Sequence, residues 1–213
     1  MKTERVFVCL FLLGFFGKML HLPIAPYIVA LTGYAMAFSY FLFGFYFFCD
    51  EKIKKQNLAL SIIAGVCLSI GPLAFAGKLL YWPESYYELL LSIVLSLIIL
   101  AFVLFLRKRA VEELKEYYKN MFLRTIAILV VSLILFIMPI STLVHIQYWD
   151  NKEFADIATS FYSNPGNAEY KKQYNLYTST HTPSGKLIKI VPPKALSMPA
   201  SVNEKSGIKK EIK

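Results

Sequence analysis

Five stretches of the chain contain no charged residue and no histidine, and this feature constrains the fold more than any other. The stretches are 12 to 28 residues long and cover Val6–Gly17, Leu22–Cys49, Leu58–Gly77, Leu89–Leu106 and Thr125–Val144. A helix needs about 17 to 25 apolar residues to cross a bilayer. Only 17% of the residues are charged, whereas soluble domains carry about 25%. The sequence therefore excludes a soluble enzyme and a disordered chain, and it predicts an all-α, polytopic membrane protein with five transmembrane helices.

The first stretch fits two descriptions. Lys2 and Arg5 precede twelve apolar residues, which is typical of a signal peptide, but no small-residue cleavage site follows. If the helix continues to Leu22, with the Lys18 ammonium reaching the headgroups, its length is about 25 Å. We predict a retained, short first span, because the sequence at its end occurs again inside the chain.

A seven-residue motif occurs twice, sixty positions apart. Residues 17–23 read GKMLHLP and residues 77–83 read GKLLYWP, and each copy ends one apolar stretch and opens the next. An internal repeat of this kind indicates a duplicated structural unit. We therefore expect two transmembrane hairpins of the same orientation, over residues 1–49 and 58–106, plus a fifth helix. The repeated residues are candidate partner contacts: Gly17, Lys18, His21, Pro23, Gly77, Lys78, Trp82 and Pro83.

The distribution of Lys and Arg predicts the orientation. Eleven of these residues lie before the first span or in the connections over 50–57 and 107–124, and two lie in the repeated turns. Basic residues in short loops favour the cytoplasmic side. We expect a cytoplasmic N-terminus, a cytoplasmic connecting helix over 107–124, a fifth transmembrane helix over 125–147 and a periplasmic tail over 148–213. The net charge of +9 thus comes mostly from the basic residues of the cytoplasmic connections and of the tail. It does not indicate nucleic acid as a partner.

The composition of the tail changes along its length. Two short helices are expected near Lys152–Tyr162 and Asn167–Tyr177, separated by Asn164-Pro165-Gly166, because Pro and Gly interrupt helices. From about residue 179 onward there is no aromatic residue, and we expect disorder. Within the spans, small residues predict close helix packing. They are Ala30, Gly33, Ala37 and Gly44 in the second span and Ser61, Gly65 and Ser69 in the third.

The sequence contains no recognised catalytic pattern. G-x-S-x-G, Walker A, H-E-x-x-H and G-x-G-x-x-G are all missing. His21 and His145 come from different connections, which makes a weak metal site. An ion-coupled transporter requires an acidic or basic residue deep within a span. No such residue falls deep within a predicted span of this chain. We predict a non-enzymatic protein without catalytic residues, cofactor or metal.

The first copy of the motif, with Gly14-Phe15-Phe16 before it and Ile24-Ala25 after it, resembles the amino-terminal hairpin of the gliding-motility protein L family. Members of that family are inner-membrane motor subunits of the Bacteroidota type IX secretion system. The second copy resembles it less, because Tyr81 replaces histidine. Where the family has an intramembrane glutamate, this chain has Met36 and Ser96. The resemblance implies a shared hairpin and a bacterial inner membrane, and it does not carry over proton-driven motor activity.

Taken together, these features favour a structural or accessory subunit of a bacterial inner-membrane envelope complex. Its partners would be the lipid bilayer and other membrane proteins or further copies of the chain. Two alternatives remain open. One is a small transporter or channel built on the hairpin repeat, with Gly71-Pro72 and Pro139 as flexible points. The other is a membrane sensor that detects with its tail.

Overall fold

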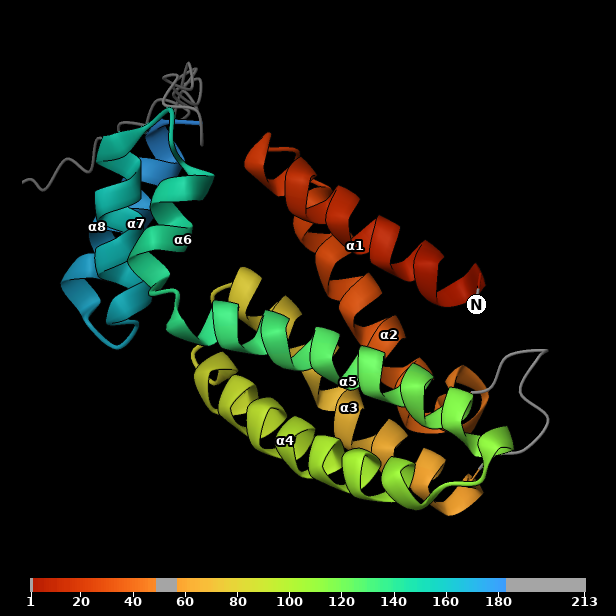
Figure 1. The fold of residues 1–213 in the computed structure, drawn as a ribbon. Coiled ribbons are helices and arrows are strands. Elements are labelled where there is room, and N and C mark those ends of the chain that lie inside the picture. Colours follow the sequence, from red (N-terminus) through yellow and green to blue (C-terminus); the bar gives the residue numbers. More distant parts are fainter. Residues whose placement is uncertain (1, 49–56, 183–213) are drawn as a thin grey trace, which may run out of the picture.

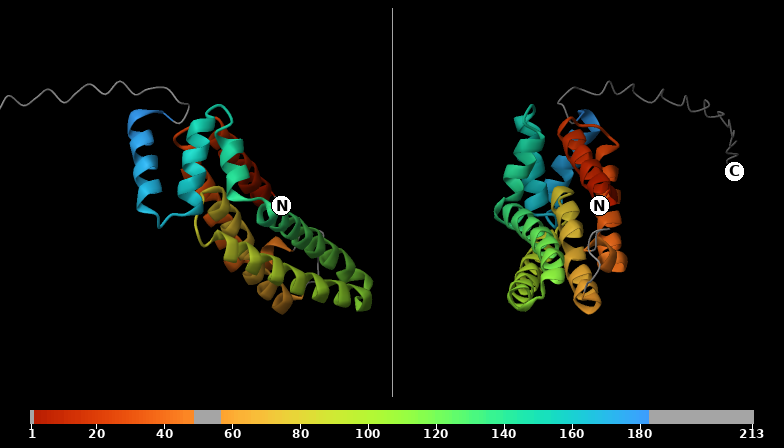
Figure 2. Two further views of the ribbon diagram at one scale, coloured as in Figure 1. Left: turned by 90° about the vertical axis from the view of Figure 1, so that its left-hand side faces the viewer. Right: turned by 45° about the vertical axis from the view of Figure 1, so that its right-hand side comes forward.

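The computed structural model describes residues 2–48 and 57–182, which form eight α-helices (Figure 1). The first five pack as an elongated bundle, and the last three gather at one end of it (Figure 2). The all-α class is confirmed for these residues. The helices are α1 (Lys2–Met19), α2 (Ala25–Phe47), α3 (Leu58–Leu79), α4 (Ser85–Arg109), α5 (Glu112–Ile137), α6 (Ile140–Gln147), α7 (Lys152–Ser163) and α8 (Ala168–Thr180).

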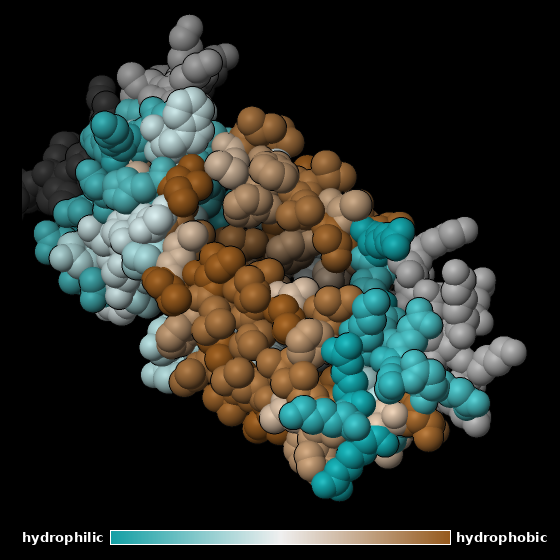
Figure 3. All heavy atoms as spheres, in the orientation of Figure 1, coloured by the Kyte–Doolittle hydropathy of each residue, from teal (hydrophilic) through white to brown (hydrophobic). Residues whose placement is uncertain are grey.

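Four of the described helices, α2 to α5, are long and apolar enough to cross a membrane. The predicted first span, α1, is a helix of 18 residues, but charged residues stand at both of its ends. Figure 3 shows an apolar surface between two hydrophilic ends of the molecule. This distribution is that of a protein whose middle lies in a bilayer and whose ends lie in water.

The connection between α4 and α5 corrects the predicted cytoplasmic helix over 107–124. No separate helix forms there, because α4 continues to Arg109 and α5 begins at Glu112. Only Ala110 and Val111 are extended, with ψ of 140° and 154°. Basic residues in the last turn of α4 and acidic residues in the first turn of α5 suit the dipoles of the two helices. Residues 112–124, which are most of the predicted connection, therefore belong to α5.

The predicted fifth span over 125–147 is also divided. α5 ends at Ile137, and α6 begins after Pro139, whose ψ of 154° is extended. Proline has no N–H to continue the helical hydrogen bonds, so a break here was expected. The two tail helices lie where the sequence predicts them, as α7 and α8. Ser179 and Thr180 still belong to α8, and the rest of the predicted disordered segment, from residue 183, lies outside the described residues.

Helices α2 and α3 approach each other at the predicted small residues. A Cβ on Gly44 would lie 2.5 Å from the Cα of Gly65, and a Cβ on Gly33 would lie 2.6 Å from the Cβ of Ala76. Polar bonds join α5 to its neighbours. Ser61 of α3 and Tyr117 of α5 have their oxygens 2.6 Å apart, and Ser92 of α4 and Ser132 of α5 have theirs 2.9 Å apart. Close backbone approach and interhelical hydrogen bonds are what hold helices together in lipid.

Candidate functional site

The two copies of the motif form turns with the same backbone hydrogen bonds. Leu22 N–H donates to the Gly17 carbonyl at 3.0 Å, and Trp82 N–H donates to the Gly77 carbonyl at 2.9 Å. This six-residue closure is the Schellman motif that ends many helices. Its left-handed position is occupied by His21, with φ of 56°, and by Tyr81, with φ of 61°. Neither is glycine, so contacts of the side chains must compensate for the strain.

His21 and Tyr81 both contact the three helices at the end of the bundle, α6–α8, which we call the outer helices. The two residues make different contacts. The His21 ring stacks on Tyr148 at 5.4 Å between centroids, and its Nε2 lies 3.1 Å from an Asp150 oxygen. The Tyr81 hydroxyl donates to Gln147 Oε1 at 2.5 Å, and its ring packs on Tyr162 at 4.5 Å. Each turn therefore fastens the α6–α8 helices to the end of the bundle.

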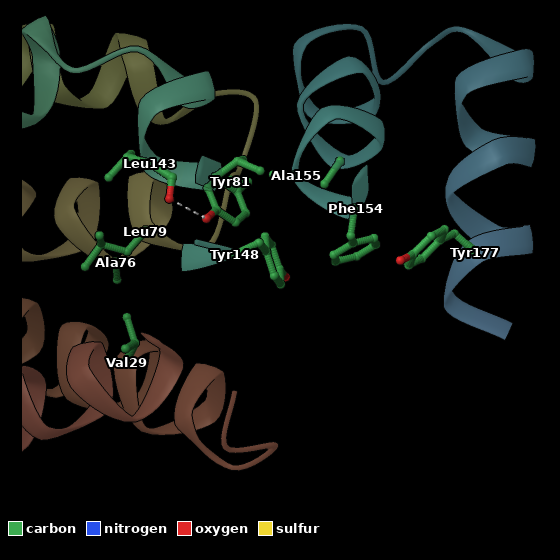
Figure 4. Packing of buried hydrophobic residues seen from close by; sticks show 11 residues of the cluster. Val29, Ala76, Leu79, Tyr81, Leu143, Tyr148, Phe154, Ala155 and Tyr177 are labelled. Carbon is green, nitrogen blue, oxygen red and sulfur yellow. Dashed lines mark hydrogen bonds between the residues drawn. The ribbon is translucent and has the colours of Figure 1, made fainter. Parts of the chain in front are cut away.

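The interior of the outer helices is aromatic. Tyr81 lies with Tyr148, Phe154 and Tyr177 in one buried cluster, together with aliphatic residues of α2, α3 and α6 (Figure 4). Burial raises the pKa of the Tyr81 and Tyr148 hydroxyls above the usual value. These hydroxyls are therefore protonated at neutral pH, and Tyr81 acts as a hydrogen-bond donor.

Removal of one hydroxyl tests this attachment. In Tyr81→Phe the buried Gln147 Oε1 loses its donor, which costs about 1 to 3 kcal/mol. We expect faster amide hydrogen exchange in α6 and α7, measured by mass spectrometry on the full chain in detergent. Tyr87→Phe is the matched control, because that side chain is 72% exposed in the first turn of α4. Equal exchange in the two variants would contradict the attachment.

The repeated lysines are buried, so they are not surface contacts in this structure. Lys18 is 9% exposed, donates from Nζ to the Leu79 carbonyl at the end of α3, and lies 4.0 Å from the centre of the Tyr81 ring. It therefore caps the C-terminus of α3 from the other turn. Lys78 is 4% exposed. Of the remaining motif residues, Pro23 and Pro83 are exposed and Trp82 is half-buried, 6.0 Å from the Tyr34 ring.

The glycines of the motif lie in tightly packed positions. A Cβ on Gly17 would lie 3.2 Å from the Cβ of Ala25, and a Cβ on Gly77 would lie 3.1 Å from both Glu88 Oε2 and the Trp82 ring. The two histidines considered as metal ligands, His21 and His145, pair with different carboxylates. His21 faces Asp150, while His145 Nε2 lies 3.5 Å from an Asp156 oxygen. No group of three potential metal ligands occurs in the described part of the chain.

A second site, which the sequence analysis missed, lies inside the bundle. Arg124 Nη2 of α5 lies 2.8 Å from Glu4 Oε2 in the first turn of α1, and the two side chains are only 14% and 18% exposed. The Tyr40 hydroxyl of α2 donates to the other oxygen of Glu4. Three helices thus contribute one polar side chain each to a buried ion pair.

The depth of this ion pair follows from the pairing of α4 with α5. Ser92 and Ser132 are hydrogen-bonded, and the two helices run in opposite directions, so Arg124 lies level with Leu100. The charge-free part of α4 continues to Leu106, which is about 9 Å further along at 1.5 Å per residue. The expectation that no charged residue lies deep within a span is therefore wrong for Arg124.

The ion pair forms one end of an apolar cavity of about 300 Å³ between α1, α2, α3 and α5. Figure 3 shows a hollow in the apolar face where α1 and α5 lie apart. A cavity with this lining can hold an apolar molecule. Its lining residues are Glu4, Val8, Phe11, Leu12, Met36, Tyr40, Pro72, Phe75, Arg124, Ala127, Ile128 and Val131.

A helical pattern could have revealed the site of Arg124. The buried residues Tyr117, Met121, Thr125 and Ile128 follow one another at spacings of three or four, which is the period of a helix face. This face begins before Thr125, so it predicts that the fifth helix starts upstream of Arg124. No local signal identifies Glu4 as the partner.

No protein-family model, curated protein or solved structure matches the chain.

Proposed function

We propose that the chain is a non-enzymatic membrane subunit that holds a small helical unit, α6–α8, at the outer face of a bacterial inner membrane. In this proposal α1 joins the four apolar helices as a fifth span, and the bundle consists of two repeated hairpins and α5. The N-terminus is cytoplasmic and the α6–α8 unit is periplasmic. The charge distribution supports this orientation, since basic residues end α4 at the face opposite the outer helices.

The observation that carries the proposal is the double attachment of α6–α8. His21 and Tyr81 occupy equivalent positions of the two turns, and both contact the outer helices. A unit fixed at two points presents its outer surface in a defined orientation, which suits binding to another protein. The resemblance of the first hairpin to the gliding-motility protein L family supports an inner-membrane envelope complex as the setting. Met36 and Ser96 still argue against motor activity, because neither carries a carboxylate.

The outer side of α8 is the surface that we assign to a partner. Leu176 is 64% exposed there, beside Lys171, Lys172 and Asn175, on a shallow depression. In this proposal Leu176 is the apolar centre of the contact, and the neighbouring polar side chains form its rim. A small transporter or channel is the second candidate, and the cavity beside the ion pair is the observation in its favour.

The mass of the intact complex tests the proposal. Gently solubilised protein, measured by native mass spectrometry, is expected to carry the mass of at least one other protein. Leu176→Ser should abolish that added mass without lowering the melting temperature, because it removes only an exposed apolar contact. Val111→Ser is the control, since that side chain is 62% exposed at the opposite end. A pure homo-oligomer would overturn the subunit proposal and favour the transporter or channel.

A further inference from the structure

The cavity between α1 and α5 opens toward lipid. The rim residues Val8, Leu12 and Val131 are 41%, 47% and 40% exposed. They belong to the part of the molecule where the surface is apolar (Figure 3). The molecules that reach this opening in a bilayer are therefore lipids, because a water-soluble ligand would first have to cross the hydrocarbon.

The shape of the cavity suits a chain and excludes a helix. It extends along α1 from Glu4 to Leu12, which is about 12 Å at 1.5 Å per residue. A transmembrane helix with its side chains is about 10 to 12 Å wide, too wide for a cavity of about 300 Å³. Water is also excluded from most of it, since cavities lined by apolar groups stay dry.

The polar end of the cavity suits the headgroup side of a lipid. Glu4, Arg124 and the Tyr40 hydroxyl meet there, and the neighbouring Arg5 is exposed. Charged side chains inside a span draw headgroups and water toward them by local thinning of the bilayer. Beside α1 the headgroups are therefore expected about 9 Å closer to the bilayer centre than beside the end of α4.

We propose that this cavity is a binding site for a membrane phospholipid of the leaflet nearest Glu4 and Arg124, with one acyl chain inserted between α1 and α5. The inserted chain contacts Met36 and Phe75, which line the cavity and are only partly exposed. The headgroup lies at the Arg5 and Arg124 end. This inference uses the membrane location of the helices, but it does not depend on a role as an accessory subunit.

Photo-crosslinking tests the site in the full chain. The protein is placed in vesicles of phosphatidylethanolamine and phosphatidylglycerol that contain a small amount of phosphatidylglycerol with a diazirine in the middle of one acyl chain. After irradiation and digestion, adducts are located by mass spectrometry. We expect adducts on the Met36 and Phe75 side chains themselves, in addition to adducts on lipid-facing positions.

A cavity-filling variant makes the test specific. Ala127 lines the cavity and is exposed in it, so Ala127→Phe places a ring where the acyl chain would lie. We expect loss of the Met36 and Phe75 adducts, with adducts on the outward faces unchanged. Val130→Phe is the control, because Val130 is 46% exposed on the same helix and does not line the cavity.

Two results would overturn the proposal. One is labelling restricted to outward faces in the unmodified protein. The other is labelling of Met36 and Phe75 that persists in Ala127→Phe at the level seen in Val130→Phe. The mass of the intact complex is a separate measurement, so failure here leaves the subunit proposal standing, and the reverse is also true.

Discussion

The variant Gly65→Ala is expected to lower the stability of the bundle by about 1 to 3 kcal/mol, and Gly65→Leu by more. A Cβ at position 65 would lie 2.6 Å from the Tyr40 carbonyl oxygen and 2.7 Å from the Gly44 Cα. Both are backbone atoms of α2, so the clash cannot be relieved by a side-chain rotation. The two helices would have to separate along their contact.

The sign of this effect makes it a strong test. In a helix interior, alanine is favoured over glycine by about 1 kcal/mol, so without the close approach Gly65→Ala would stabilise the protein. The measurement is the midpoint of unfolding in mixed detergent micelles with increasing dodecyl sulfate. Gly166→Ala serves as the control, because nothing lies within 4 Å of a Cβ built there. A midpoint for Gly65→Ala at or above that of the control would contradict the packing of α2 on α3.

The packing of α2 on α3 could be predicted because its signal is local. Small residues recur along one side of each span, and lipid offers no hydrophobic force to bring helices together, so close approach is the remaining solution. Gly33, Gly44 and Gly65 behave as this argument expects. The tail helices could also be predicted from local signals. Asn164-Pro165-Gly166 separates two short segments, and each segment begins after an asparagine cap.

The attachment of the outer helices could be predicted only in part. The repeated motif identifies two equivalent turns, but it does not indicate that His21 and Tyr81 adopt a left-handed conformation, which glycine normally occupies. Their polar contacts are with Asp150 and Gln147, which lie more than sixty residues later. Lys18 shows the same limit, because a lysine at a span end normally reaches toward water, whereas here it caps α3.

The position of Arg124 could not be inferred from charge alone. Arg124 is reasonably assigned to the cytoplasmic connection when the fifth span is expected to begin at Thr125. The depth of a residue, however, is set by the register between neighbouring helices, and here the bond between Ser92 and Ser132 defines it. Its partner Glu4 lies near the start of the described chain, far from Arg124 in the sequence. Only the tertiary structure therefore brings the two charges together.

Arg124→Leu is expected to destabilise the protein by about 3 kcal/mol or more, because it leaves the Glu4 carboxylate buried without its charge partner. The loss should show as a lower midpoint in the same dodecyl sulfate titration. Glu4→Leu should cost less, since the long Arg124 side chain can turn toward the headgroups once it is released.

The double variant Glu4→Leu/Arg124→Leu decides between two roles of the ion pair. If the charges are retained for stability, the double variant should be clearly less stable than the unmodified protein. The ion pair costs desolvation, and a buried pair is often replaced by apolar residues without loss. We therefore expect the double variant to be more stable than Arg124→Leu alone, with a coupling energy of about 1 to 3 kcal/mol. Additive single effects would contradict a direct interaction between Glu4 and Arg124 and would place the carboxylate outside the cavity. A double variant as stable as the unmodified protein would mean that the pair contributes little to the stability of the bundle. If the double variant keeps the stability of the unmodified protein but changes the lipid labelling, the two charges belong to the lipid-binding site.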